Sequence, residues 1–255
     1  MRGKNYPNSA GEEARVVVIT GGARRLGAAI ARRLHGEGLR IIIHYRHAAS
    51  EAEQLKLELE LQRPNSVALI QGDLLAIKAL PQLATAMIAI WGRLDMLVNN
   101  ASTFYPTPLG SITEADWDDL LGSNLKAPLF LTQALAAELT ARGGAVVNMV
   151  DIHAERPMQA HTVYCIAKAG LAMLTRSLAR ELGPQVRVNG IAPGAILWPE
   201  QGMESSKQEE ILKRNFLQRS GTPEDIAAAV VFLLLQADYT SGHILPVDGG
   251  RLVNI

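Results

Sequence analysis

The sequence contains a single cysteine, Cys165, so the chain cannot form a disulfide within itself. This is consistent with a reducing compartment. Aromatic residues make up only 5%, and there is no excess of charge, because 25 Lys and Arg balance 25 Asp and Glu. A chain with no net charge has no general attraction for nucleic acid or for anionic membranes, so we expect neither as a partner.

Long hydrophobic runs are also absent. The longest run, residues 226–235, is ten residues long and too short to span a bilayer. Residues 1–14 are polar and lack the apolar stretch of a signal peptide, so we expect a flexible N-terminal segment and a cytoplasmic protein. The six histidines show no metal-ligand spacing, and we expect no metal site.

From residue 15 to residue 255, strand-like and helix-like segments alternate without a linker, which indicates one domain. The expected strands are residues 15–20, 39–45, 66–71, 96–99, 145–150, 186–191 and 243–247. The expected helices are residues 26–35, 51–62, 76–91, 115–121, 124–142 and 161–182, with another that begins at Thr222. Continuous apolar strands separated by helices predict an α/β fold of the Rossmann type: a doubly wound parallel sheet of about seven strands with helices on both faces. Ligands then bind beyond the carboxyl ends of the strands.

The first expected strand ends in a glycine-containing turn, residues 20–27, and a helix follows it. Glycines allow a tight turn and a close approach of the backbone to a pyrophosphate, and the helix N-terminus offers free N–H groups. The alternative is an ordinary strand-to-helix turn. The context of strand and helix favours a dinucleotide site.

The end of the second strand bears on which dinucleotide is bound. An NAD site usually has Asp or Glu about 20 residues beyond the glycines. Here the strand ends in His44-Tyr45-Arg46-His47, and no acid follows until Glu51. An arginine suits a 2′-phosphate, and Arg25 in the glycine turn is placed to reach the adenosine phosphates. We therefore expect NADPH, with a solvent-exposed loop charge as the alternative for Arg46.

Tyr164 and Lys168 are four residues apart in a helix-like segment, so their side chains share one helix face. A lysine ammonium near the phenol favours the phenolate and brings proton transfer closer to neutral pH. Asp151 ends the fifth strand thirteen residues before Tyr164. Asn124 begins an earlier helix, and Asn99 ends the fourth strand, where an amide either binds a cofactor or fixes nearby backbone.

Taken together, these motifs resemble the short-chain dehydrogenase/reductase family over nearly the whole chain. The matching pieces are Thr20-Gly21…Gly27, Asn99-Asn100-Ala101-Ser102, Asn124, Tyr164-x-x-x-Lys168, Arg187-Val188-Asn189 and Pro193-Gly194. Two positions depart from the family pattern: Arg25 replaces the middle glycine, and Asp151 replaces a serine. Both departures resemble the pteridine reductase branch, which includes dihydromonapterin and dihydrobiopterin reductases.

The resemblance implies hydride transfer from NADPH to a dihydropterin, with dihydrofolate as a further candidate substrate. A carboxylate at position 151 suits a substrate that presents N–H donors better than it suits a carbonyl substrate, because a carbonyl and a carboxylate are both acceptors. The catalytic residues implied are Asp151, Tyr164, Lys168 and Asn124. The cofactor-binding residues implied are Gly21, Arg25, Leu26, Tyr45, Arg46, His47, Asp73, Asn99, Ala101, Ser102, Tyr164, Lys168, Pro193 and Gly194. The substrate-binding residues implied are Ser102, Phe104, Asp151, Tyr164 and Trp198.

Two other functions stay open at this point. One is a ketone reductase of the 3-oxoacyl-thioester type, and the other is a non-catalytic NADPH-binding sensor. Family members are commonly tetramers, so we expect a homotetramer; the apolar positions of residues 127–139 and 167–178 suit either subunit packing or their own sheet. Residues 200–219 are polar, and we expect a mobile flap there.

Overall fold

The structure is a computed structural model that describes residues 14–198, 202 and 204–254. The flexible segment predicted at residues 1–14 lies almost entirely outside the described residues. Seven parallel strands form one sheet in the order β3-β2-β1-β4-β5-β6-β7. The strands are β1 (Val16–Ile19), β2 (Arg40–Tyr45), β3 (Val67–Gln71), β4 (Met96–Asn99), β5 (Ala145–Met149), β6 (Arg187–Pro193) and β7 (Ile244–Val247). The predicted Rossmann-type fold is confirmed.

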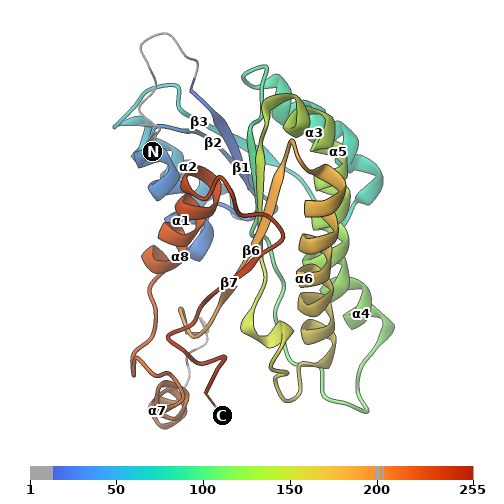
Figure 1. Ribbon diagram of the computed structural model, residues 1–255, viewed down its shortest axis with the longest axis vertical. Helices are drawn as coiled ribbons and strands as arrows, with labels where there is room; N and C mark the ends of the chain where they lie inside the picture. The colour runs from blue at the N-terminus through green and yellow to red at the C-terminus, as the bar shows by residue number, and fades with distance from the viewer. Residues whose placement is uncertain (1–13, 199–201, 203, 255) are drawn as a thin grey trace.

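Helices cover both faces of the sheet (Figure 1). On one face lie α1 (Arg25–Gly36), α2 (Ala49–Glu60) and α8 (Pro223–Val231). On the other lie α3 (Leu80–Ala89), α5 (Ala127–Arg142) and α6 (Thr162–Leu182), with α4 (Glu114–Leu121) beside α6. Strand β1 shows why: Val17 and Ile19 point into the first hydrophobic core, and Val16 and Val18 into the second. An all-apolar strand of this kind needs cover on both sides.

One difference from the expected elements lies between α4 and α5. The two helices expected at 115–121 and 124–142 are joined by a π-helical turn, Gly122–Lys126. Pro128 has no N–H to donate to the carbonyl of Asn124, so a regular α-helical hydrogen bond is impossible there. Such π-turns often occur at functional sites.

The helix α7 (Ser205–Lys213) lies within the segment, residues 200–219, that was expected to be a mobile flap. The mobility of this segment stays a prediction.

The helix start at Thr222 follows the predicted capping pattern. The Thr222 hydroxyl accepts from the Asp225 amide at 3.2 Å, the Asp225 carboxylate accepts from the Thr222 amide at 2.8 Å, and Pro223 is the first helical residue.

On α5 and α6 most apolar residues face their own sheet, as with Leu135 and Leu171. Ile166 and Met173 of α6 remain 44% and 59% exposed, and the homotetramer stays a prediction.

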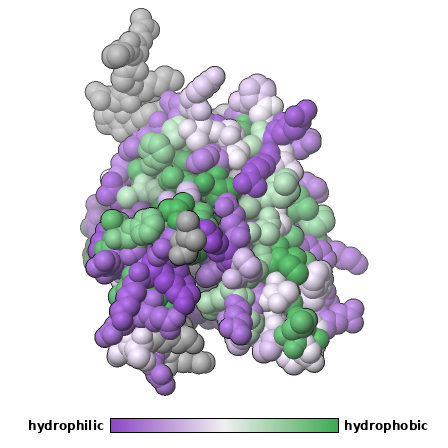
Figure 2. Space-filling view, turned by 60° about the horizontal axis from the view of Figure 1, so that its bottom comes forward, coloured by the Kyte–Doolittle hydropathy of each residue, from purple (hydrophilic) through white to green (hydrophobic). Residues whose placement is uncertain are grey.

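The carboxyl ends of the strands meet at one edge of the sheet, at the bottom of Figure 1. Figure 2 turns this edge forward, and hydrophilic side chains cover much of the middle of that face. The order of the sheet reverses between β1 and β4, because β2 and β3 extend one way and β5 to β7 the other. In open α/β sheets the ligand site lies at this reversal. No helix among the described residues is long and apolar enough to cross a membrane.

Candidate active site

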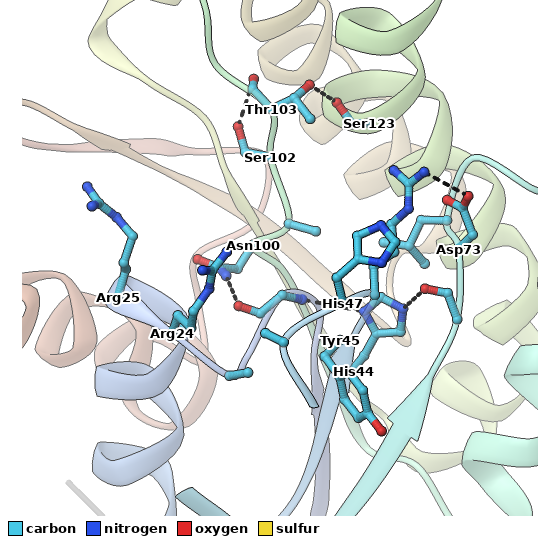
Figure 3. A pocket seen from close by; sticks show the side chains of 18 of the residues that line it. Arg24, Arg25, His44, Tyr45, His47, Asp73, Asn100, Ser102, Thr103 and Ser123 are labelled. Carbon is cyan, nitrogen blue, oxygen red and sulfur yellow. Dashed lines mark hydrogen bonds and ion pairs between the residues drawn. The ribbon is translucent and has the colours of Figure 1, made fainter. Parts of the chain in front are cut away.

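A pocket of about 470 Å³ lies at the reversal point, between the carboxyl ends of β1, β2 and β4 (Figure 3). It contains a large part of the cofactor set predicted from the sequence. The predicted residues that line it are Gly21, Arg25, Leu26, Tyr45, Arg46, His47, Asp73, Ala101 and Ser102. Segments that are far apart in the chain thus contribute to a single concave wall.

The glycine turn after β1 is fitted closely to the loop after β4. Gly21 has a left-handed φ of +58°, and a Cβ atom there would lie 3.1 Å from the Cα of Ala101. A Cβ on Gly27 would collide with the Gly21 carbonyl. The amide of Asn100 donates to the carbonyls of Thr20 and Gly21 at 2.9 and 3.0 Å. Positions 21 and 27 of the turn therefore require glycine, and Gly21 lines the pocket.

Arg25 adopts a left-handed φ of +52°, a conformation that favours glycine. This is the position at which the family pattern has its middle glycine. Its guanidinium donates to the Trp198 carbonyl at 3.3 Å, across the site. A side chain in a strained backbone conformation at a cleft is a sign that the side chain itself is needed there.

Replacing Arg25 by glycine removes this backbone strain, so we expect the free energy of unfolding to rise by about 1 kcal/mol. Arg24→Gly is the matched control, because Arg24 has an extended φ of −137° and should gain nothing. Urea unfolding followed by circular dichroism measures both variants. Equal changes in the two variants would contradict the assignment of strain to Arg25.

His44 supports the same turn from β2. Its Nδ1 accepts from the Gly21 amide at 3.4 Å, and its Nε2 donates to the Gly72 carbonyl at 3.2 Å. Burial lowers the pKa of His44 to about 4, so the ring is neutral at physiological pH and can fill both roles at once. The sequence analysis did not identify this role, because a histidine in a strand gives no signal of its two backbone partners.

Positive charge gathers at the rim of this pocket. Arg24 and Arg25 come from the glycine turn, and His47 comes from the loop after β2 (Figure 3). Arg46, which precedes His47, lines the same pocket. Arg24 was not predicted as a site residue, although its place beside Arg25 was a usable signal. Arg46 forms an ion pair with Asp73 at 3.2 Å, and both side chains are about half exposed. Exposed pairs of this kind are weak and rearrange at little cost.

Several predicted cofactor residues lie outside this pocket wall. The amide of Asn99 is buried and donates to Asn148 at 2.8 Å and to Thr132 at 3.3 Å, so it ties β4 to β5 and α5. These partners are side chains and not the nearby backbone that was expected, and a contact between Asn99 and the cofactor stays a prediction. Pro193 ends β6, and the amide of Gly194 donates to Val247 at 3.0 Å, which places both at the carboxyl edge.

Asp151, Tyr164 and Lys168 come together beside the pocket. The Tyr164 hydroxyl donates to Asp151 Oδ2 at 2.8 Å, and the His153 amide donates to Asp151 Oδ1 at 2.8 Å. Lys168 Nζ donates to the Met149 carbonyl at 2.8 Å and lies 5.6 Å from the centre of the Tyr164 ring. Residue spacing in α6 places the phenol and the ammonium on one face, as predicted, and the end of β5 brings the carboxylate to them.

The direction of the Tyr164 pKa differs from the sequence-based expectation, which was a shift toward neutral pH. Burial, followed by the charge and the hydrogen bond of Asp151, raises the pKa of Tyr164 well above its ordinary value. Burial also lowers the pKa of Lys168 to about 8, against the opposing effect of Asp151. A buried phenol bonded to a carboxylate holds its proton. In this structure Tyr164 is therefore a protonated donor rather than a phenolate.

Asn124, in the π-helical turn, holds the loop after β4. Its amide donates to the carbonyls of Thr103 and Leu120 at 2.9 and 3.0 Å, and its Oδ1 accepts from the Ser102 hydroxyl at 2.6 Å. In the part of the chain that the structure describes, this side chain bonds to these groups and not to Lys168. The catalytic role implied for Asn124 stays a prediction.

Phe104 projects from the loop after β4 and is 51% exposed. Its ring stacks on His161 with centroids 4.8 Å apart, and it meets the Tyr164 ring edge-on at 4.8 Å. The structure thus brings a flat, exposed aromatic ring directly beside the phenol of Tyr164.

Trp198 follows β6, and its carbonyl oxygen accepts a hydrogen bond from Arg25. No cluster of metal-capable side chains occurs among the described residues.

Comparison with known proteins agrees with this architecture. The family model described as enoyl-(acyl carrier protein) reductase matches residues 21–251. Pteridine reductase 1 of Leishmania tarentolae is 37% identical, over 92% of this chain and 95% of the relative. A ketoacyl reductase of the granaticin polyketide synthase of Streptomyces violaceoruber is 33% identical, over 93% of this chain and 96% of its own. A 3-oxoacyl-[acyl-carrier-protein] reductase of Staphylococcus epidermidis is 30% identical, over 91% and 97%. The chain belongs to the short-chain dehydrogenase/reductase family, and its predicted resemblance to pteridine reductases is confirmed.

Proposed function

We propose that this reductase uses NADPH to transfer a hydride to a dihydropterin and give the tetrahydro form. The observation that carries the proposal is the 2.8 Å bond from Tyr164 to Asp151, at the position where the family pattern has a serine. A pterin presents an amino group and ring N–H groups, which a carboxylate can accept. The identity to a protein named pteridine reductase 1 supports the same substrate class.

The pocket at the glycine turn fits a dinucleotide. Gly21 lines the pocket at a left-handed φ, where any larger residue would press on Ala101, and Arg24 and Arg25 line the same pocket. Arg46 and His47 would hold the 2′-phosphate, with Leu26, Tyr45, Asp73, Ala101 and Ser102 along the wall. Pro193 and Gly194 would bound the nicotinamide end, where Lys168 would hold the ribose and Tyr164 would face it. When bound, the reduced nicotinamide supplies a hydride.

Arg46→Ala is expected to weaken NADPH binding about ten- to a hundredfold, because it removes a charge-assisted hydrogen bond to the phosphate. Binding of NADH, which has no 2′-phosphate, should change little. Fluorescence titration of the two reduced cofactors against native and variant protein measures the difference. Equal losses for both cofactors would remove the reason for assigning NADPH.

Reduction of a C=N bond also needs a proton on nitrogen. Tyr164 would supply it: its O–H bond would break as the N–H bond forms, and the ammonium of Lys168 would stabilise the phenolate. Each oxygen of Asp151 already accepts one hydrogen bond and can accept a second. Asp151 can therefore bind a pterin N–H and also pass a proton from solvent back to Tyr164.

Phe104 supplies the surface on which a flat ring would stack. One face of its ring is covered by His161, and the side chain is half exposed. A bicyclic heteroaromatic ring gains from stacking on such a plane. Ser102 and Trp198 would contact the same ring from the loops after β4 and β6.

The matches to ketoacyl reductases make 3-oxoacyl-thioester reduction a second candidate. Asp151 argues against it, because a carboxylate cannot donate a hydrogen bond to the substrate carbonyl. Steady-state NADPH oxidation with dihydrobiopterin, dihydromonapterin, dihydrofolate and a 3-oxoacyl thioester separates the two. We expect turnover of dihydropterins; turnover of the thioester alone would overturn the proposal.

A further inference from the structure

A second pocket, of about 330 Å³, lies next to Asp151 and outside the wall of the first pocket. Three separate segments form it: the turn after β5, the end of α7 and the C-terminal tail. Its lining includes Ile152, His153, Arg156, Arg214, Arg251 and Asn254. None of these side chains has a part in the function proposed above.

The lining of this pocket is strongly basic. It contains three arginines and a histidine and no acidic side chain. Arg214 pairs with Glu210 of its own helix at 2.6 Å, but within the described residues neither Arg156 nor Arg251 has an ion-pair partner. Burial and the nearby charge of Arg214 both lower the pKa of Arg251, while Asp151 and Asp248 oppose this. Positive charges held together in this way favour an anion between them.

The pocket is held in place by hydrogen bonds of the backbone. The carboxylate of Asp248 accepts from the amides of Gly250 and Leu252 at 2.9 and 2.6 Å, which forms the tight turn that carries Arg251. The amide of Asn254 donates to the Arg214 carbonyl at 2.7 Å and ties the tail to the end of α7. These bonds fix the backbone that carries Arg251 relative to the end of α7, which carries Arg214.

The turn after β5, which carries Arg156, is connected to the Asp151 carboxylate. The amide of His153 donates to Asp151 Oδ1 at 2.8 Å, and the His153 ring bonds to the Arg156 carbonyl at 2.7 Å. Arg251 lies close enough to Asp151 for their charges to interact. A substrate ring bound at Asp151 would thus have a substituent directed to the arginines.

We infer that this pocket binds an anionic group on the side chain of the substrate, so that the preferred substrates are pterins that carry a phosphate ester or a carboxylate. The inference rests on the proposed function and names its substrate class more narrowly. A guanidinium presents paired N–H donors that match both phosphate and carboxylate oxygens. The side-chain amide of Asn254 bonds to Arg214 through one N–H, and its second N–H can donate to the same group.

Kinetics with three substrates test the inference. The substrates are a dihydropterin with a neutral hydroxyalkyl side chain, the phosphate ester of the same compound, and dihydrofolate, which carries carboxylates. Native protein should show a KM for one or both anionic substrates about ten- to a hundredfold below that of the neutral one, the effect of one hydrogen bond to a charged group. The Arg251→Gln and Arg156→Gln variants should each lose most of that preference and keep the neutral KM.

A binding measurement gives a readout besides turnover. Calorimetric titration of inorganic phosphate into NADPH-saturated protein, whose cofactor phosphate sites are filled, should show binding that either variant weakens. Arg176→Gln is the control, because Arg176 is an exposed arginine of α6 that lines neither pocket. Arg156 is exposed, so its variant should fold even if the Arg251 variant does not.

The outcomes separate the two proposals. If the neutral dihydropterin is reduced but the anionic substrates show no lower KM, the pocket inference is overturned and the proposed function stands. If no pterin is reduced, the proposed function fails, and the inference with it. Loss of phosphate binding and of the substrate preference in both pocket variants, but not in Arg176→Gln, supports the anion site. A changed oligomeric state with unchanged KM values would instead assign the arginines to subunit contact and overturn the inference.

Discussion

Replacing Tyr164 by phenylalanine is expected to lower turnover of a dihydropterin about 10²–10⁴-fold, the effect of losing a positioned general acid. The variant keeps the aromatic ring that packs against Phe104 and removes only the hydroxyl that donates to Asp151. NADPH affinity should change little, because Lys168 keeps its bond to the Met149 carbonyl. Steady-state rates at saturating NADPH, together with fluorescence titration of NADPH, give both quantities.

Tyr105→Phe is the matched control for this experiment. Tyr105 packs in the same small cluster as Tyr164, but its hydroxyl bonds to Asp119, and its pKa is raised to about 12 by burial and by that carboxylate. Removing this hydroxyl should leave turnover within a factor of a few. Full activity in Tyr164→Phe would show that the phenol is not the proton donor. A protein that binds NADPH and reduces none of the substrates would instead match the sensor considered in the sequence analysis.

Asp151→Asn is expected to lower dihydropterin turnover by a similar factor, about 10²–10⁴-fold, because an amide cannot accept and return a proton. Its oxygen can still accept from the His153 amide, so the turn after β5 should keep its shape. The substitution also removes the charge that helps to raise the pKa of Tyr164, so that pKa should fall in the variant. Rates measured over a pH series show both changes.

Asp151→Ser distinguishes the substrate classes, because it restores the residue of the general family pattern. A hydroxyl can donate to a carbonyl, so the variant should lose pterin turnover and keep or gain reduction of a 3-oxoacyl thioester. The ratio of the two kcat/KM values measures the change in specificity. An unchanged ratio would mean that Asp151 does not select the substrate.

The fold could be predicted from the sequence because the strands are buried on both faces of the sheet. Runs such as Val16–Ile19 are fully buried in the structure, and a continuous apolar strand of this kind has few alternatives to a covered parallel sheet. The helix start at Thr222 could also be predicted, because its capping box involves only Thr222 and Asp225, three residues apart in the sequence. The juxtaposition of Tyr164 and Lys168 followed from helical spacing alone.

The parts that sequence reasoning could not supply depend on partners far apart in the chain. The Asn99 amide is used inside the sheet because Asn148 and Thr132 lie opposite it, which no spacing reveals. The raised pKa of Tyr164 follows from burial, which outweighs the expected effect of Lys168. The basic pocket joins Arg156, Arg214 and Arg251, and each of them, read alone, resembles an ordinary surface charge.

The most direct test of the site is a crystal structure of the protein with NADP⁺ and dihydrobiopterin bound. We predict that the pterin lies between Phe104 and the nicotinamide, with Asp151 accepting from its N–H groups and the Tyr164 hydroxyl within hydrogen-bonding distance of the ring nitrogen that gains the proton. A pterin bound elsewhere, or an Asp151 carboxylate turned away from it, would contradict the proposed function.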